Sequence, residues 1–462
     1  MARTTEQYIP GSFRDPSGFL YNKDGILYRQ INNYYRDNYD HLMNSGLHET
    51  LTSKKLLIQH EEVETEAPEP EKAYKIIRPD PIPFISYPYE WCFSQLKDAA
   101  LTTFQIQKIS MEFGMTLKDC SAYNIQFKDC RPVLIDTLSF EKYTEGQSWN
   151  AYRQACQHFL APLALMSYSD IRLSQLLRVY IDGIPLDLAS LLLPSRTSLN
   201  TGILSHIHLH SKSQKYFADR KVKIDSRKIS RLSFLGFIDN LESTIKKLEY
   251  RAAGTEWADY YNDTNYPAEA LQHKKDIISK MLSETRTNML WDLGANDGLF
   301  SRIASDRGIY TISFDVDNAA VEKNYLTSTS NNETSILPLL LDLTNPSPAI
   351  GWENKERMSL INRGPADTVF ALALVHHLAI SNNLPFSRIV DFFGSICKWL
   401  IIEFIPKDDS QVQRLLSTRK DIFTNYDKDN FEKEFSKVFN IIRAEKIIGS
   451  KRTLYLMLKN EN

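Results

Sequence analysis

Short apolar segments that read as buried strands recur through the C-terminal part of the chain. They lie at residues 288–293, 310–314, 336–341, 368–374 and 399–404. Helical patterns separate several of them, and this alternation is typical of a mostly parallel sheet with crossover helices. Residues 438–448 and 452–458 are expected to add an antiparallel edge. The pattern predicts an α/β domain over residues 255–462, with ligands bound at the carboxyl ends of the strands.

The N-terminal part follows a different pattern. Asp24-Gly25 stands between alternating apolar residues and predicts a β-hairpin over residues 17–32. Apolar residues recur at helical spacing over 99–113 and 156–168. We therefore expect an α+β domain over residues 1–210.

A basic run follows the N-terminal part. Residues 212–231 carry eight Lys or Arg against two Asp. A solvated linker or helix face is the default interpretation of such a run, ahead of a docking patch for an anionic partner. We predict a basic helical connector over residues 211–254.

The segment after the first C-terminal strand carries the most informative motif. It reads Leu290-Trp-Asp-Leu-Gly-Ala-Asn-Asp-Gly-Leu-Phe-Ser301. A pyrophosphate cofactor is bound by bare backbone N–H groups and a helix N-terminus in a G-x-G-x-x-G turn. Here Asp292 and Asp297 would repel a pyrophosphate, whereas a ligand with ammonium and sulfonium centres gains charge-assisted hydrogen bonds. The motif therefore favours S-adenosylmethionine over NAD as cofactor.

The turn itself has the order G-x-N-x-G. Gly294 and Gly298 allow the loop to approach a ligand without a Cβ clash. Asn296 takes the place of a glycine, and asparagine is the side chain that best tolerates left-handed dihedrals. We expect all three residues to contribute to the cofactor site.

Three acids follow successive predicted strands. We expect Asp292 to bind the methionine ammonium, Asp315 to accept from the ribose hydroxyls and Asp342 to accept from the adenine amine. A lone aspartate is more often a turn or helix cap. Three acids in order at strand ends favour a cofactor site instead.

The acid followed by spaced glycines resembles the first motif of class I S-adenosylmethionine-dependent methyltransferases, over roughly residues 255 to 460. The whole chain is similar to the bacterial methyltransferase group of nodulation protein NoeA. That resemblance is carried by residues 87–91, 117–119, 123–127, 134–141, 158–163, 181–186 and 403–406. It implies a Rossmann-like methyltransferase domain with bound S-adenosylmethionine, and it associates the chain with a glycan acceptor.

Methyl transfer to a hydroxyl needs a group that takes up the acceptor's proton. The fourth predicted strand runs into His376 and His377, at the carboxyl edge of the sheet. Histidine has an unperturbed pKa of about 6.5 and suits general-base work at neutral pH. The alternative role is a helix cap or packing under the cofactor. Glu403, at the end of the fifth strand, is the second candidate base or an acceptor-orienting group.

A second, weaker signature lies in the N-terminal part. Asp119, Asn124 and Asp136 have a spacing that resembles the catalytic and metal-binding loops of protein and aminoglycoside kinases. No histidine stands two residues before Asp119, and no glycine-rich phosphate loop is visible before residue 80. A kinase-like domain and a structural hairpin stabilised by Asp119 and Asn124 turns are the two interpretations.

His206, His208 and His210 alternate as in a strand, which would project three imidazoles to one face. Metal ligands usually have partners at further spacing, and none is evident here. A loop or interdomain contact is therefore the default interpretation, and no metal is expected.

Composition bears on the class of partner and on the cellular compartment. The 462 residues carry a formal net charge of −2, which gives no global electrostatic reason to expect nucleic acid. Five widely spaced cysteines without a C-x-x-C pair favour a reducing compartment. No membrane span or signal peptide is expected. We therefore predict a cytoplasmic enzyme.

We expect the chemistry to be O-methylation of a glycan or small-molecule hydroxyl by S-adenosylmethionine. One rival is a bifunctional kinase and methyltransferase that acts on a polysaccharide. The other is a noncatalytic protein that binds S-adenosylmethionine and serves as a scaffold.

Overall fold

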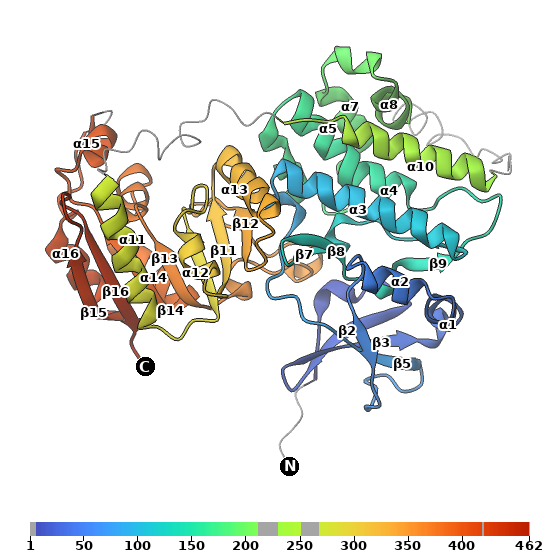
Figure 1. Cartoon of the computed structure of the whole chain (residues 1–462), viewed down its shortest axis with the longest axis horizontal. Coiled ribbons are helices and arrows are strands. Elements are labelled where there is room, and N and C mark those ends of the chain that lie inside the picture. The colour runs from blue at the N-terminus through green and yellow to red at the C-terminus, as the bar shows by residue number, and fades with distance from the viewer. Residues whose placement is uncertain (1–5, 211–229, 251–267, 418–419, 462) are drawn as a thin grey trace. The chain divides into compact units, whose positions relative to one another are not determined.

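A computed structural model describes the chain except residues 1–5, 211–229, 251–267, 418–419 and 462 (Figure 1). The chain forms two compact units. The first comprises residues 1–251 together with Ala349–Arg357, and the second comprises residues 252–348 and 358–462. The sequence therefore leaves the second unit once and returns to it, which the sequence pattern did not predict.

The first unit begins with an antiparallel sheet in the order β1-β2-β3-β5-β4. Its strands are β1 (Glu6–Tyr8), β2 (Gly18–Lys23), β3 (Ile26–Asn32), β4 (His60–Glu62) and β5 (Ala73–Pro79). The predicted hairpin is confirmed, because Asp24 (φ 53°) and Gly25 (φ 80°) form the left-handed turn between β2 and β3. Two small two-stranded antiparallel sheets follow, β6 (Met115–Leu117) with β9 (Phe140–Lys142) and β7 (Ile125–Lys128) with β8 (Arg131–Leu134).

Helices make up most of the remainder of this unit. They are α1 (Arg36–Asn44), α2 (Leu47–Ser53), α3 (Phe93–Glu112), α4 (Tyr152–Ala155), α5 (Ala161–Tyr168), α6 (Leu176–Val179), α7 (Leu186–Leu192), α8 (Thr201–Ile203) and α10 (Arg231–Lys246). The long helix α3 covers the predicted 99–113 helix as far as Glu112 and begins earlier, because the Gln95 side chain accepts from the Cys92 N–H at 3.0 Å and caps its first turn. The α+β pattern of the N-terminal part is thus present.

Helix α10 lies in the predicted connector and packs along α3. The Lys108 ammonium contacts the Glu242 carboxylate at 2.5 Å, and Arg231 donates to the Met111 carbonyl at 2.9 Å. This described part of 211–254 is therefore integrated into the first unit. Residues 211–229 and 251–254 lie outside the described residues.

The second unit is built on a seven-stranded sheet in the order β12-β11-β10-β13-β14-β16-β15. The strands are β10 (Met289–Leu293), β11 (Tyr310–Asp315), β12 (Ile336–Leu340), β13 (Ala366–Ala371), β14 (Cys397–Phe404), β15 (Phe439–Lys446) and β16 (Thr453–Lys459). The first five run parallel, and β16 pairs antiparallel with both β14 and β15. This mixed sheet confirms the predicted methyltransferase-like α/β fold with its antiparallel edge.

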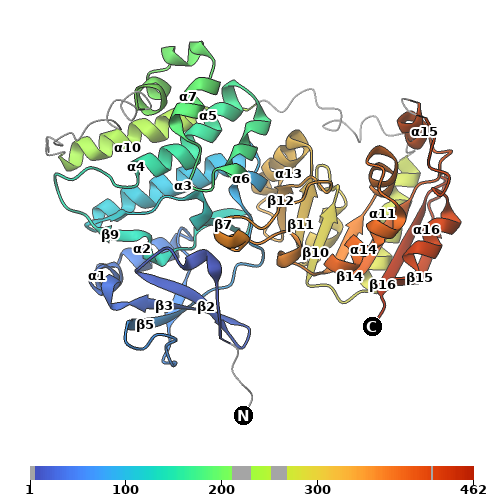
Figure 2. The same ribbon diagram turned by 180° about the vertical axis from the view of Figure 1, so that it is seen from behind.

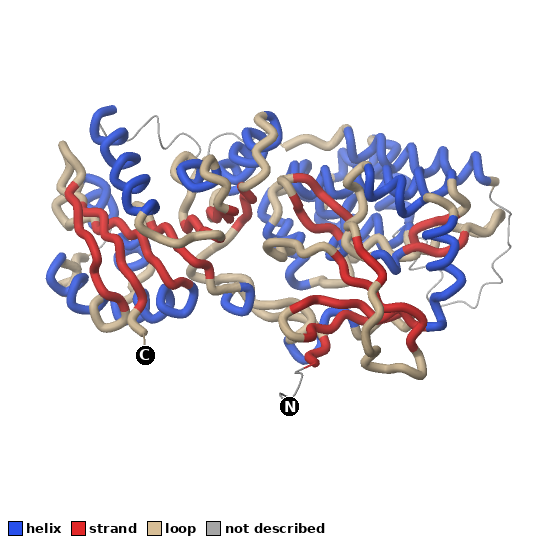
Figure 3. Tube along the Cα trace, turned by 60° about the horizontal axis from the view of Figure 1, so that its bottom comes forward, coloured by secondary structure: helices blue, strands red, loops and turns tan. Residues whose placement is uncertain are grey.

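Helices cover both faces of this sheet, as Figures 2 and 3 show. They are α11 (Ala268–Ser283), α12 (Ser301–Ser305), α13 (Asn318–Ser330), α14 (Phe386–Ile396), α15 (Ser410–Leu416) and α16 (Lys428–Phe435). Strand alternation assigns the faces: Ile401 packs in one core with α11, whereas Phe404 contacts Phe431 of α16 with ring centroids 5.0 Å apart. Glu403 therefore lies on the α11 side. No described helix is long and apolar enough to cross a membrane.

Candidate functional site

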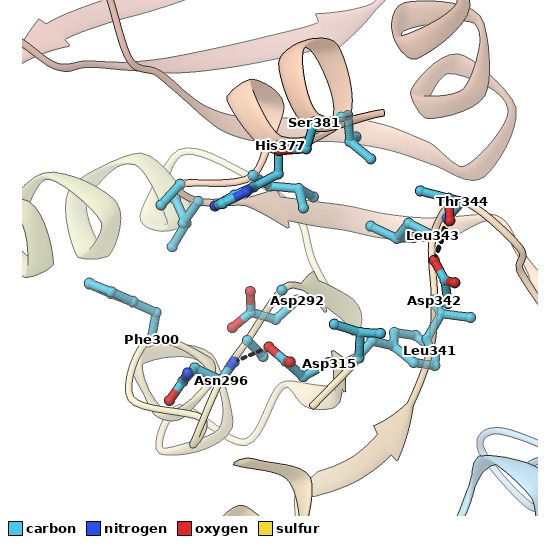
Figure 4. A pocket seen from close by; sticks show the side chains of 18 of the residues that line it. Asp292, Asn296, Phe300, Asp315, Leu341, Asp342, Leu343, Thr344, His377 and Ser381 are labelled. Carbon is cyan, nitrogen blue, oxygen red and sulfur yellow. Dashed lines mark hydrogen bonds between the residues drawn. The ribbon is translucent and has the colours of Figure 1, made fainter. Parts of the chain in front are cut away.

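A cavity opens at the carboxyl ends of the parallel strands of the second unit. Its lining comes from the ends of β10, β11, β12 and β13, from α11 and from the segment after β13. Figure 4 shows Phe300 at one end and Asp342 with Thr344 at the other, with Asp292 and Asp315 between them. Ligands of open α/β sheets bind at this edge, because the loops that follow the strands converge there.

The loop after β10 has the geometry that its sequence predicts. Gly294, Asn296 and Gly298 have φ angles of 79°, 52° and 82°. A Cβ at Gly298 would lie 2.5 Å from Asn324 Oδ1, so this position also requires glycine for space. Gly294 and Asn296 line the cavity, whereas Gly298 does not belong to the lining and shapes the turn behind it.

Asp292 is buried at the end of β10. Its carboxylate accepts from the Ser301 hydroxyl at 2.6 Å. Burial raises the pKa of Asp292 to about 7, although the Ser301 hydrogen bond lowers it. A cation bound in the cavity would favour the charged form, so the site gains affinity from a ligand that carries an ammonium or sulfonium centre.

Asp315 ends β11 beside the same loop. Its carboxylate accepts from the backbone N–H groups of Asn296 at 2.7 Å and Asp317 at 2.9 Å. Burial nevertheless raises the pKa of Asp315 to about 6. Asp342 also lines the cavity, where its Oδ1 accepts from the backbone and hydroxyl of Thr344. All three predicted strand-end acids thus meet in one cavity.

The two histidines after β13 occupy different environments. The strand ends at Ala371, earlier than the predicted 374, and Ala373 takes a φ of 50° in the turn that follows. His377 lines the cavity and faces Asp292 in Figure 4, whereas His376 lies buried behind it. Burial, and next the charge of His377, hold the pKa of His376 well below its usual range. His377 is therefore the better placed of the two to meet a ligand.

Glu403 lies beneath the cavity and does not line it. It is fully buried, and its Oε2 accepts from the Lys274 ammonium at 2.7 Å and from the Ala373 N–H at 2.8 Å. This carboxylate thus holds the left-handed turn after β13 in place. The sequence pattern did not single out Lys274, because nothing distinguishes it from the adjacent Lys275 until the helix is packed.

The acids of the first unit also come together. Asp119 and Asn124 lie within reach of each other, and Ser139 joins Asn124 (3.4 Å) to Asp136 (2.5 Å). The Arg29 guanidinium of β3 contacts Asp136 at 2.5 Å. Burial, and next the charge of Asp136, raise the pKa of Asp119. The predicted trio is therefore a cluster, but Asp136 is already paired.

The three histidines at 206–210 do not form a strand. Residues Leu204–Leu209 form a π-helix that continues α8, so the predicted alternation is wrong. His206 contacts Tyr152 Oη and Asn240 Oδ1, each at 2.9 Å, and His208 lies between the hydroxyls of Ser190 and Thr197. Among the described residues, no group of three or more His, Cys, Asp or Glu could hold a metal ion.

One known protein is similar to this chain over almost its whole length. It is 32% identical over 98% of its length to nodulation protein NoeA of Rhizobium meliloti (strain 1021), and covers 96% of that protein. The chain belongs to the NoeA family. No protein-family model matches this member of the NoeA family.

The two solved structures described here resemble less than half of the NoeA-family chain. The magnesium protoporphyrin IX methyltransferase of Synechocystis PCC 6803, crystallised with S-adenosylhomocysteine, is 15% identical over 44% of this chain and 93% of its own, with a TM-score of 0.31. The bifunctional kinase-methyltransferase WbdD is 14% identical over 43% of this chain and 41% of its own, with a TM-score of 0.28. Likenesses at this level assign no function to the NoeA-family chain.

The raised pKa of Asp292 makes the stability of the ligand-free NoeA-family protein depend on pH. An unfolded aspartate has a pKa of about 3.9, so between that value and about 7 the folded state holds a proton that the unfolded state has released. This stabilisation is complete at acid pH and is lost as pH rises through about 7. Asp292→Asn has no such proton to lose and keeps an oxygen that accepts from Ser301. We expect it to stabilise the protein at about pH 8 by roughly 2 kcal/mol, with little effect near pH 4.5, in urea unfolding.

Asp297→Asn is the matched control, because Asp297 lies in the same loop and pairs with the exposed Lys323 at 2.9 Å. It should change stability little at either pH. An equal effect of Asp292→Asn at both pH values would contradict the buried, protonated state of Asp292.

Proposed function

We propose that the second unit is an S-adenosylmethionine-dependent methyltransferase that methylates a hydroxyl group of a glycan or small molecule. The observation that supports this proposal most directly is the convergence of Asp292, Asp315 and Asp342 around a left-handed loop at the carboxyl edge of the sheet. Burial raises the pKa values of Asp292 and Asp315, because their charged forms have lost hydration. A cationic ligand would replace that lost stabilisation of the charged carboxylates.

The residues fit the cofactor part by part. Asp292 would bind the methionine ammonium, and Asp315 would accept from the ribose hydroxyls. Asp342 and the apolar Leu341 and Leu343 would surround the adenine. When bound, the cofactor supplies an electrophilic methyl group on its sulfonium. Gly294, Asn296 and Gly298 form the turn that lets the backbone approach it.

His377 is the residue we propose to take up the proton of the acceptor hydroxyl. It lines the cavity across from Asp292 and is partly exposed to it. His376 and Glu403, the other two predicted candidates, lie behind the lining, so we assign them support of the turn after β13. A general base in this position typically contributes about 10²- to 10⁴-fold to the rate.

The cofactor assignment is tested by calorimetric titration with S-adenosylmethionine. The wild-type protein should bind with micromolar or tighter affinity, and Asp292→Asn should weaken binding by at least about tenfold, because a charge-assisted hydrogen bond is lost. Asp297→Asn should bind like the wild type. Since Asp292→Asn is expected to stabilise the fold, loss of binding cannot be attributed to unfolding. Absence of binding by the wild type would overturn the proposal.

The acceptor chemistry is tested with S-adenosylmethionine that carries a labelled methyl group, offered with a panel of oligosaccharides and small hydroxyl compounds. Label transferred to a hydroxyl survives treatment with base as a methyl ether, whereas a methyl ester is hydrolysed. His377→Asn should lower transfer by about 10²-fold or more while cofactor affinity stays unchanged. A noncatalytic scaffold would instead bind cofactor normally and show no transfer in either protein.

A bifunctional kinase and methyltransferase acting on a polysaccharide is the second candidate. The observation in its favour is that Asp119, Asn124 and Asp136 converge in the first unit. Magnesium and ATP would have to displace Arg29 from Asp136, which costs an ion pair.

This alternative makes its own prediction. The wild-type protein should bind magnesium ATP in calorimetry, and Asp136→Asn should abolish that binding because a metal ligand is lost. Asp129→Asn, in the turn between β7 and β8, is the control, since the Asp129 carboxylate pairs with the exposed Lys55 at 3.5 Å. Lack of ATP binding by the wild type would leave the first unit without a kinase role.

A further inference from the structure

A hairpin from the second half of the sequence projects an exposed aromatic ring from the first unit. The hairpin comprises Ala349–Arg357, which belongs to that unit and is drawn in orange in Figure 2. Its turn begins with Trp352, which is 66% exposed. The other tryptophans that the structure describes are buried or half-buried. Exposing a large apolar ring to water is unfavourable, so its position at the tip needs a physical reason.

Buried contacts fix this hairpin to the first unit. Its ends are joined by backbone hydrogen bonds between Ile350 and Arg357, at 3.1 and 3.2 Å. The Glu356 side chain is 4% exposed and accepts from Arg14 Nε at 2.8 Å. A Cβ at Gly351 would lie 2.6 Å from Glu356 Cβ, so this position needs glycine for the Glu356 side chain to fold back. The base of the hairpin is therefore held in place while its tip stays in solvent.

The tip has a strained backbone that packing does not repay. Glu353 and Asn354 follow Trp352 with φ angles of 54° and 56°, in the left-handed region that is unfavourable for residues with a Cβ. Both residues are exposed, so burial of their side chains does not offset the strain. Backbone strain of this kind clusters at ligand-binding sites, where the turn holds a side chain in a required position. The strain therefore indicates that the hairpin presents Trp352 to a ligand.

Groups that can bind hydroxyls lie beside the Trp352 ring. Glu353 and Lys355 form an exposed ion pair at 2.9 Å. A hydrogen bond from Lys355, and to a lesser degree one from Trp352, lowers the pKa of Glu353, so the indole N–H faces this carboxylate. Phe13 is 55% exposed, and its ring centroid lies 5.6 Å from the guanidinium of Arg14, the residue that holds the hairpin. This surface thus combines aromatic faces with a carboxylate and an ammonium group.

A sugar has the complementary chemistry. One face of a pyranose ring presents C–H groups that pack on an aromatic face, and its hydroxyls donate to carboxylates and accept from ammonium groups. A protein partner or a bilayer would favour a continuous apolar patch, whereas here charged side chains alternate with the rings. The hairpin also continues a segment that lines the cavity of the second unit, since Trp352 stands eight positions after Thr344.

We propose that Phe13, Trp352, Glu353 and Lys355 form a sugar-binding platform on the first unit, which holds the glycan acceptor of the methyl transfer. This inference rests on the proposed function and selects the glycan from its two acceptor classes, because a small hydroxyl compound needs no second binding surface. The platform binds the acceptor chain and takes no part in the chemistry. It binds sugar whether or not the cofactor is present.

Sugar binding is tested by saturation-transfer NMR on the full chain without cofactor, with cellohexaose, maltohexaose and laminarihexaose as the probes. We expect transfer to the ring C–H protons of at least one hexasaccharide, because packing of C–H groups on an aromatic face depends little on the linkage. Trp352→Ala should weaken that binding by about tenfold or more, whereas Trp352→Phe keeps an aromatic face and should retain most of it.

Tyr34→Ala is the matched control, because Tyr34 is an aromatic residue of the same unit that is 77% exposed, and this variant should bind sugar like the wild type. Circular dichroism checks that the variants are folded, which the exposure of both rings favours. If the wild type binds none of the three hexasaccharides, or if Trp352→Ala binds them unchanged, the inference is overturned.

A hexasaccharide that binds then serves as acceptor for the labelled methyl group. Trp352→Ala should raise the KM for this acceptor about tenfold or more and leave kcat and the affinity for S-adenosylmethionine unchanged, since the platform contributes equally to the ground state and the transition state. A lower kcat at unchanged KM would contradict the platform. Sugar binding without cofactor binding would overturn the proposed methyltransferase and keep the platform, and cofactor binding without sugar binding would do the reverse.

Discussion

Burial of carboxylates at the ends of parallel strands is the constraint on which the second unit depends. Asp292, Asp315 and Glu403 all lie at this edge of the sheet, and each loses hydration that must be replaced. The Lys274 ammonium compensates the buried charge of Glu403. The same carboxylate accepts from the Ala373 N–H and so fixes the turn after β13. Asp292 and Asp315 are compensated by hydrogen bonds and keep raised pKa values. This difference separates a structural acid from two acids suited to a cationic ligand.

The buried acids of the first unit are compensated differently from those of the second unit. Asp136 caps the turn that follows it and pairs with Arg29, so hydrogen bonds and a cation from the same unit lower its pKa although burial raises it. Asp119 retains a raised pKa beside it. A cluster neutralised from within is stable without a ligand, whereas the cavity of the second unit gains electrostatic complementarity only when a cation binds.

A short segment from the second half of the sequence belongs to the first unit. The segment after β12 first lines the cavity through Leu341 and Thr344, and its continuation Ala349–Arg357 packs as part of the first unit. There Glu356 pairs with Arg14 at 2.7 Å, and the Arg357 guanidinium lies 4.5 Å from the centre of the Tyr123 ring. The predicted boundaries at 210 and 255 could not show this, because such contacts join residues hundreds of positions apart.

The sequence by itself determined the strands of the second unit, the left-handed loop at Gly294, Asn296 and Gly298, and the order of the three strand-end acids. Apolar periodicity, glycine and asparagine dihedrals and strand polarity are local properties, so they can be read without the fold. Only the tertiary structure separated His377 from His376, ended the strand at Ala371 and showed the His206–His210 segment to be helical. It alone revealed the buried ion pair of Lys274 and Glu403, because burial and charge pairing are created when distant elements pack together.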